Sequence, residues 1–189
     1  MKITEKDLKI VEFLDIVGVA DTSTINKMFF NNSVKACKNR MKPLYDFKLV
    51  KRMDRIYINQ EYVYYTKKKP KQLEHKLLFS RFVAELKYGG AEIIKIKCPL
   101  KISDVIADGF IVYKVNETTR IALVEVENQK SFKSNMSKYK SLYRSMAWKE
   151  YFNVFPNIII VSNEREIKID DLNLIFIKKD FSNIDKILE

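Results

Sequence analysis

The stretch from Asp108 to Lys130, DGFIVYKVNETTRIALVEVENQK, decides the interpretation of the fold. Its two apolar runs, joined by residues 116–118, predict a β-hairpin with a buried second strand, because β-branched residues dominate that strand. Asp108 lies on the first strand, and the alternation of side chains puts Leu123, Glu125 and Glu127 on one face of the second. Two carboxylates so placed lie about 7 Å apart and repel each other by about 2 kcal/mol at an effective dielectric of about 20. A cation, a proton or water has to relieve that repulsion.

The composition around this stretch predicts a soluble, globular and basic chain. The 189 residues are 47% hydrophobic and 31% charged, which argues against disorder and allows one large domain or two small ones. The 35 Lys and Arg outnumber the 24 Asp and Glu, for a formal charge of +11. Such an excess predicts a polyanionic partner, with nucleic acid ahead of an acidic membrane surface.

Cysteine usage and hydropathy predict a cytoplasmic protein. Cys37 and Cys98 are the two cysteines, and their wide separation predicts neither a disulfide framework nor a metal-binding motif. The N-terminus lacks the apolar run of a signal peptide, and no run of about 18 apolar residues occurs. We therefore expect no membrane partner.

Upstream, residues 1–70 predict three helices followed by a β-ribbon, with the basic and proline-containing stretch 67–70 as a boundary. Thr4 is the expected cap of the first helix, with an acidic residue three positions on, and Gly18 its expected end. The third helix is expected from Val34 towards Phe47, with a kink or early break at Pro43. The order of these elements is typical of a winged helix-turn-helix domain, although Lys48 stands where a glycine often does.

The third helix and the ribbon are the predicted contacts to double-stranded DNA, because they carry the densest positive charge. Residues 1–70 hold 15 basic and 8 acidic residues, against 20 and 16 in residues 71–189. The predicted DNA-binding residues are Lys35, Lys38, Asn39, Arg40, Lys42, Lys51, Arg52 and Arg55. The alternative is that these charges form a solvated helix face. The tyrosines of the ribbon, at 57, 62, 64 and 65, are expected to pack in the core rather than to stack on bases.

Downstream, residues 71–189 predict a second domain with the order αβββαββ, so the fold class is α/β (α+β). Helices are expected at about 72–88, ended by Gly89 and Gly90, and at about 132–152. The expected strands cover residues 92–98, 104–114, 119–128, 157–162 and 174–177. Trp148 is assigned to the core or to an interface, and His75 to a packed or capping position, with a ligand or base role as its alternative.

This order resembles the PD-(D/E)xK nuclease fold, in which an Asp and a Glu-x-Lys on adjacent strands share a divalent metal. The resemblance implies Asp108, Glu125 and Glu127 as catalytic residues, with Asp108 and Glu125 as ligands of Mg²⁺ or Mn²⁺ if the domain is a nuclease. The sequence departs from the motif, because Ala107 stands where the Pro would be and Glu127 where the Lys would be. The lysines at 130, 133 and 138 are candidate replacements for that Lys.

Most of the chain resembles the replication-relaxation family of plasmid and phage proteins, which join an N-terminal winged helix to a nuclease-like domain. The features that carry this resemblance are LEHKL at 73–77, the strand with Asp108, the acidic pair Glu125 and Glu127, and SKYKSLY at 137–143. The resemblance implies a sequence-specific DNA-binding protein that acts in replication, copy control or DNA relaxation and transfer, with a nuclease-like domain that does not cleave. It leaves open a homodimer and replication or transfer proteins as partners. The alternatives are a metal-dependent endonuclease or nickase targeted by the winged helix, and a transcriptional regulator.

Overall fold

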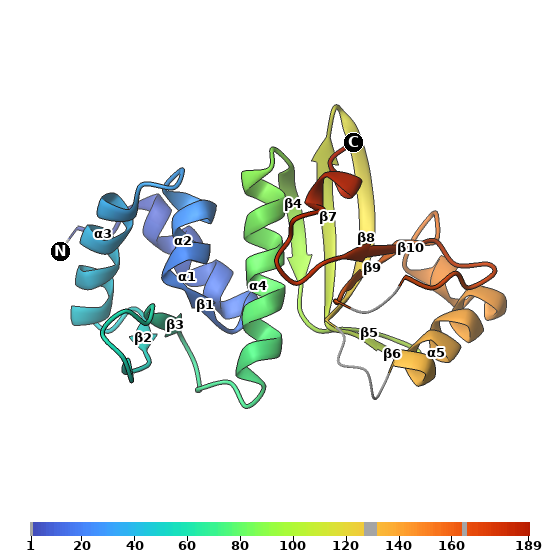
Figure 1. Cartoon of the computed structure of the whole chain (residues 1–189), viewed down its shortest axis with the longest axis horizontal. Helices are drawn as coiled ribbons and strands as arrows, with labels where there is room; N and C mark the ends of the chain where they lie inside the picture. Colours follow the sequence, from blue (N-terminus) through green and yellow to red (C-terminus); the bar gives the residue numbers. More distant parts are fainter. Residues whose placement is uncertain (1, 127–131, 164–165) are drawn as a thin grey trace. The chain divides into compact units, whose positions relative to one another are not determined.

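The computed structural model of the chain describes residues 2–126, 132–163 and 166–189. It is a mixed α/β structure that divides into two compact units, one ending at Tyr88 and the other beginning at Gly89 (Figure 1). The α/β class expected from the sequence is therefore confirmed. No helix in the described part of the chain is long and apolar enough to cross a membrane.

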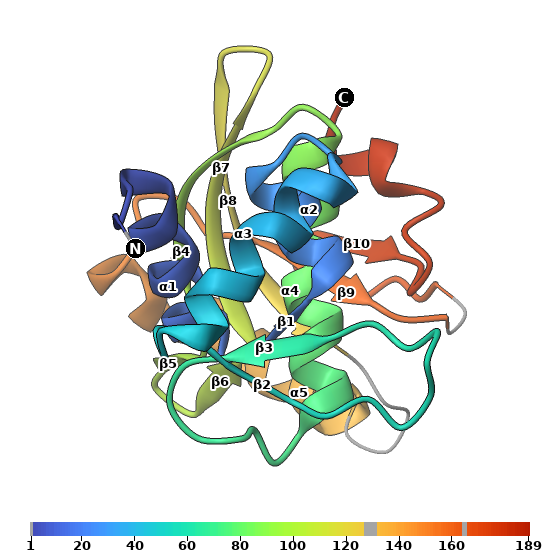
Figure 2. The same cartoon turned by 90° about the vertical axis from the view of Figure 1, so that its left-hand side faces the viewer.

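The first unit contains four helices and a small three-stranded antiparallel sheet. The sheet has the order β1-β3-β2, so the last strand of the unit lies between the first two. The elements are α1 (Glu5–Val17), β1 (Ala20–Asp21), α2 (Thr22–Phe29), α3 (Val34–Asp46), β2 (Lys51–Arg52), β3 (Val63–Tyr65) and α4 (Leu73–Tyr88). Figure 2 looks onto α3 and the β2–β3 hairpin, which occupy one face of this unit.

The ends of α1 follow the expected local chemistry. Thr4 and Asp7 form a capping box, in which each side chain accepts the backbone N–H of the other residue. Gly18 ends the helix with φ of +83°, a conformation that favours glycine, and its N–H donates to the carbonyl of Leu14. Both predictions for this helix are confirmed.

Helix α3 runs from Val34 to Asp46, as expected, and of the two possibilities raised for Pro43 the early break does not occur. Lys48, two residues after the end of the helix and ahead of the hairpin, has a φ of +61°. Lysine therefore occupies a left-handed position, the conformation for which glycine is the usual choice.

Helix α4 belongs to the first compact unit, whereas it was expected to open the second domain after a boundary at residue 70. The helix packs against α2 and β1. Polar contacts add to that packing: Arg81 Nε lies 2.7 Å from the buried Asp21 carboxylate, Lys27 pairs with Glu85, and Lys87 Nζ donates to a backbone carbonyl of α2 at 2.6 Å. The glycines after the helix end it as expected, and Gly90 has a φ of +108°.

The second unit is built on a five-stranded mixed sheet with the order β10-β9-β8-β7-β4 (Figure 1). Strands β4, β7 and β8 are antiparallel neighbours, whereas β9 is parallel to β8 and β10 is parallel to β9. The elements are β4 (Glu92–Lys97), β5 (Leu100–Ile102), β6 (Val105–Ala107), β7 (Gly109–Val115), β8 (Thr118–Val126), α5 (Phe132–Ser145), the 3₁₀ helix η1 (Ala147–Glu150), β9 (Asn157–Val161), β10 (Leu174–Ile177) and the 3₁₀ helix η2 (Ile184–Ile187).

The expected strand 104–114 is divided in two at Asp108. Its first part, β6, pairs with β5 as a separate two-stranded sheet, and its second part, β7, pairs with β4 and β8. The division has a physical cause, because the Asp108 carboxylate accepts the backbone N–H of Val126 at 2.8 Å and thereby ties the bend to the end of β8. The hairpin predicted from residues 108–126 is otherwise present, with a two-residue turn at Asn116 and Glu117.

Helix α5 covers one face of this sheet together with the β5–β6 hairpin. Met136, Tyr139 and Leu142 of the helix are buried in the same cluster as Leu123 of β8 and Ile158 of β9. The helix ends at Ser145, earlier than the expected end near residue 152, and η1 follows it. Trp148 is buried in η1, and its indole N–H donates to a backbone carbonyl of α5 at 3.2 Å, so its assignment to the core is confirmed.

Candidate nucleic-acid interface

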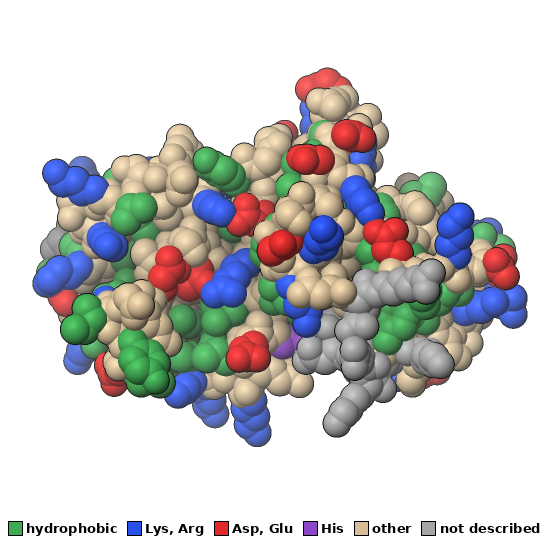
Figure 3. Space-filling model, viewed as in Figure 1, with side chains coloured by type: hydrophobic (Ala, Val, Ile, Leu, Met, Phe, Trp, Pro, Cys, Tyr) green, Lys and Arg blue, Asp and Glu red, His purple; other side chains and the backbone are tan. Residues whose placement is uncertain are grey.

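The outer face of α3 presents a row of polar and basic side chains. Cys37, Met41 and Leu44 are buried, and these positions fix which side of the helix packs against the unit. Four of the predicted DNA-binding residues are exposed and recur at intervals of three and four along the opposite side: Lys35, Lys38, Asn39 and Lys42. Figure 3 shows lysine and arginine side chains along the edge of the first unit where Figure 1 places α3.

Arg40, also predicted as a DNA contact, lies apart from that row. Its guanidinium pairs with Asp7 on α1, with Nε 2.6 Å from Oδ1, and it also donates to the backbone carbonyl of Lys2 at 3.0 Å. The hydrogen bond from Arg40 holds the pKa of the Asp7 carboxyl well below its usual range. The cation is therefore engaged inside the unit, where it joins α3 to the first turn of α1.

The three predicted residues of the β2–β3 hairpin differ in their surroundings. Lys51 is exposed and its ammonium donates to the carbonyl of Lys67 at 2.7 Å. Arg52 is half-buried, whereas Arg55 is exposed and donates to the carbonyl of Ile58 at 3.0 Å. Lys42 on α3 is also partly neutralised, because it pairs with Asp46 at 2.7 Å.

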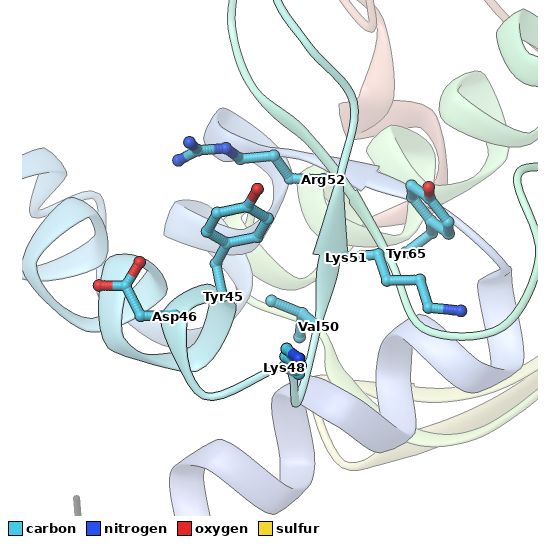
Figure 4. Close-up of a pocket in the computed structure, with 7 residues that line it drawn as sticks. All are labelled: Tyr45, Asp46, Lys48, Val50, Lys51, Arg52 and Tyr65. Atoms are coloured by element: carbon cyan, nitrogen blue, oxygen red, sulfur yellow. The ribbon is translucent and has the colours of Figure 1, made fainter.

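The two arginines of the hairpin alternate with two tyrosine rings, and we call these four side chains the cation–π column. The guanidinium carbon of Arg52 lies 4.0 Å from the centre of the Tyr45 ring and 4.1 Å from the centre of the Tyr62 ring. The guanidinium carbon of Arg55 lies 4.1 Å from the centre of that same Tyr62 ring. Figure 4 shows Tyr45 and Arg52 side by side, one on α3 and the other on β2. The column therefore joins α3 to the hairpin and fixes the orientation of both cations.

The column lies at the wall of two hollows. The larger, of about 860 Å³, is lined by side chains of α2, α3 and the hairpin, and Lys38, Lys42, Arg52 and Arg55 are its cations. The carboxylates of Asp46 and Glu61 also line it, which partly offsets that charge. The smaller hollow, of about 580 Å³, lies on the other side of Arg52 and is bordered by Lys48 and Lys51 (Figure 4). This part of the unit is thus a hollowed, mainly cationic surface.

Sequence reasoning missed the column, because the tyrosines of the ribbon, Tyr62 among them, were assigned to the core. A signal was present in the pairing of the two strands. Arg52 stands opposite Tyr64 in the ladder, and Tyr62 lies two residues before Tyr64, just ahead of β3, so a diagonal contact from Tyr62 to Arg52 is geometrically natural. That register cannot be read from the sequence before the length of the β2–β3 loop is known.

In the second unit, the structure places Asp108 and Glu125 at the same end of β8. Asp108 accepts the backbone N–H of Val126, the neighbour of Glu125, and Glu125 is only 3% exposed. The hydroxyl of Tyr139 on α5 donates to Glu125 Oε1 at 2.5 Å. The prediction that Leu123 and Glu125 share the face opposite Val124 is confirmed, because Leu123 and Tyr139 belong to the same buried cluster. Glu127, the third predicted catalytic residue, lies outside the described residues.

A small cavity of about 130 Å³ opens beside Glu125. Val105 and Ile106 line one side of it, and Asn135, Lys138 and Tyr139 of α5 line the other. Lys138, one of the three lysines considered as a replacement for the motif lysine, thus borders the same cavity as Glu125. Lys130 lies outside the described residues, and the side chain of Lys133 is not described. Among the described residues, no group of three or more His, Cys, Asp or Glu side chains could hold a metal ion.

Three further residues singled out in the sequence are His75 and the two cysteines. His75 is half-buried on α4. Cys37 and Cys98 form no disulfide, and burial raises the pKa of the Cys37 thiol to about 12, so that thiol is protonated and inert at neutral pH.

The chain was also compared with known proteins: no family model, no curated protein and no solved structure matches it.

Proposed function

We propose that this chain is a DNA-binding protein whose first unit acts as a winged helix-turn-helix. The observation that carries the proposal is the convergence of cations from two elements on one hollow: Lys38 and Lys42 come from α3, and Arg52 and Arg55 come from the hairpin. Duplex DNA carries about one negative charge per 1.7 Å of axis, so a cationic surface that follows a helix is suited to it. In this proposal α3 enters the major groove and the β2–β3 hairpin is the wing.

The order of elements supports the same proposal. A helix, a short strand, two further helices and a two-stranded ribbon are the parts of a winged helix, and the short strand pairs with the ribbon. In the second unit, three antiparallel strands, a helix and a further parallel strand are the arrangement expected of a nuclease-like domain. The proposed biological role is in replication, copy control or transfer of plasmid or phage DNA, with the second unit as a non-catalytic part of the assembly.

Fluorescence anisotropy with the full-length protein tests the DNA-binding proposal. A labelled duplex of about 30 base pairs is titrated at several salt concentrations between about 50 and 200 mM, a range over which phosphate contacts lose affinity steeply. We expect the logarithm of the affinity to fall linearly with the logarithm of the salt concentration, with a slope of about −4 to −7 if five to seven or so phosphates are contacted. Absence of binding at the lowest salt concentration contradicts the proposal.

A second candidate function, a metal-dependent endonuclease, is favoured by one observation. The Asp108 carboxylate accepts the backbone N–H of Val126, the residue after Glu125 on β8, and Lys138 borders the cavity next to Glu125. Oxygen ligands of this kind suit Mg²⁺ or Mn²⁺, and a lysine nearby could orient water at a phosphodiester. We rank this candidate second because Tyr139 already donates to Glu125 and no three-residue metal cluster occurs among the described residues.

A further inference from the structure

The tip of the β2–β3 hairpin, residues 55–60, exposes three consecutive large apolar side chains. Ile56 is 80% exposed, Tyr57 is 70% exposed and Ile58 is 93% exposed. Figure 3 shows apolar side chains at the part of the first unit where Figure 1 places this loop. Removing such side chains from water is favourable, so the tip gains from a partner that covers it.

The tip is an ordered turn that holds these side chains outward. The N–H of Ile56 donates to the side-chain carbonyl of Gln60 at 2.8 Å, and the N–H of Gln60 donates to the carbonyl of Tyr57 at 3.1 Å. The Arg55 guanidinium donates to the carbonyl of Ile58 at 3.0 Å. Because these hydrogen bonds are made within the turn, the apolar side chains are presented in a defined arrangement before any partner arrives.

The charge around the tip identifies the class of that partner. Residues 48–69 contain seven Lys and Arg and two acidic residues, Asp54 and Glu61. The Glu61 carboxylate accepts the N–H of Ser23, and Arg55 is held at the base of the tip by the ring of Tyr62. The tip is apolar and the residues around it are basic. A complementary partner therefore has an apolar interior bordered by negative charges. Stacked bases between two phosphate backbones have that character, whereas a second copy of this tip brings the same positive charge.

We propose that the hairpin tip is a wedge that enters the minor groove of duplex DNA and separates one base step. Apolar side chains inserted in this way unstack bases and bend the duplex, and arginines beside them are attracted by the potential of the groove. Pyrimidine–purine steps such as TA open most easily, so the tip prefers them to stiff A-tracts. This inference rests on the proposed function, and it adds the part of the duplex that the hairpin reads.

The test uses two fluorescently tagged duplexes that share their length and flanks, one with a central TA step and one with a central A-tract. Each carries 2-aminopurine at its centre, whose emission rises when the base is unstacked, and binding is followed separately by anisotropy. The test variant is Ile56→Ser with Ile58→Ser, the conservative variant is Ile56→Leu with Ile58→Leu, and Leu8→Ser, on the exposed side of α1, is the matched control.

We expect 2-aminopurine emission to rise when the wild type binds the TA duplex, and this rise to persist in the leucine and control variants. In the serine variant the rise is lost, and affinity for the TA duplex falls about tenfold while affinity for the A-tract duplex changes less than about twofold.

Two outcomes overturn the wedge and leave DNA binding intact. In one, the wild type binds without any change in emission; in the other, the serine variant gives the same rise in emission as the wild type. No anisotropy change with either duplex instead removes the proposed function and the wedge with it. If the serine variant shifts a wild-type dimer to a monomer in sedimentation with emission unchanged, the tip is a self-association surface and the wedge is wrong.

Discussion

Arg40 on α3 and Asp7 on α1 form an ion pair in which Arg40 Nε lies 2.6 Å from Asp7 Oδ1. Asp7 is 1% exposed and also accepts the backbone N–H and the hydroxyl of Thr4, so one carboxylate caps α1 and anchors α3 at the same time. A basic residue on the predicted recognition helix thus has an internal partner. Substitution of Arg40 therefore tests how the first unit is packed, whereas substitution of the exposed lysines on α3 tests its surface for DNA binding.

We expect Arg40→Ala to lower the urea midpoint of unfolding clearly, because it leaves the buried Asp7 carboxylate without its cation. The pH dependence follows from the lowered pKa of Asp7. Because the pKa of the Asp7 carboxyl is lower in the folded than in the unfolded protein, this group stabilises the fold at pH values above its unfolded pKa of about 4. That stabilisation is lost as the pH falls towards the pKa of the folded state. The stability difference between wild type and variant should therefore be largest at neutral pH and should shrink below about pH 4. Urea titrations from neutral to acidic pH measure it, and a difference that does not change with pH contradicts this assignment.

The cation–π column is expected to set the position of the hairpin cations. Tyr62→Leu removes the ring between Arg52 and Arg55, and we expect DNA affinity to fall about three- to tenfold, because each contact is worth about 0.5–1 kcal/mol or more. Tyr88→Leu on α4, which removes a ring that Lys27 contacts outside the hairpin, is the control, and it should change affinity by less than about twofold. Anisotropy titrations at one salt concentration compare the two. Equal effects of both substitutions would show that the column does not orient the arginines for binding.

The turn between β7 and β8 carries backbone strain that substitution can relieve. Asn116 and Glu117 both have positive φ, +47° and +65°, and the second of these positions strongly favours glycine in two-residue hairpins. We expect Glu117→Gly to raise the free energy of unfolding by about 0.5–1 kcal/mol. The lost ion pair with Lys114 costs little, because the Glu117 side chain is 91% exposed. Asn116→Gly is the control with a smaller expected gain, because asparagine tolerates this conformation, and destabilisation by Glu117→Gly in chemical denaturation would contradict the explanation.

Cleavage is the property that separates the two candidate functions of the second unit. Supercoiled DNA is incubated with Mg²⁺ or Mn²⁺ and the wild-type protein, with Asp108→Ala and Glu125→Gln in parallel. We expect no nicking by the wild type, in accord with a non-catalytic role. Nicking by the wild type that disappears in both variants would establish the endonuclease instead. Circular dichroism spectra of the variants check that they are folded, so that loss of cleavage is not caused by unfolding.

The sequence allowed prediction of those features that depend on local chemistry. The cap at Thr4, the stop at Gly18 and the buried β8 strand all follow from residue type and spacing, and the structure confirms them. At Pro43 local chemistry left a kink or an early break open, and the helix does not break there. Proline there removes one hydrogen bond, yet Leu44 is fully buried one residue further on, and tertiary packing of this kind outweighs propensity.

The features that were not predicted depend on contacts between segments far apart in the sequence. The pairing of Arg40 with Asp7 spans 33 positions, and the grouping of α4 with the first unit depends on ion pairs such as that between Asp21 and Arg81. Periodicity identifies α4 as a helix but does not say which neighbour covers it. For the same reason, the sequence could not single out Lys138 among the three lysines considered as replacements for the motif lysine. The structure places Lys138 at the cavity beside Glu125.

The central claim is that the exposed face of α3 contacts duplex DNA, and the salt dependence of binding tests it most directly. Lys35→Ala with Lys38→Ala removes two cations from that face, and Lys6→Ala with Lys9→Ala removes two from α1 as a matched control. If each lysine neutralises one phosphate, the slope of log affinity against log salt should decrease in magnitude by about two in the first variant and stay unchanged in the control. Identical slopes for wild type and the α3 variant, with both proteins folded and bound to the duplex, would contradict the account.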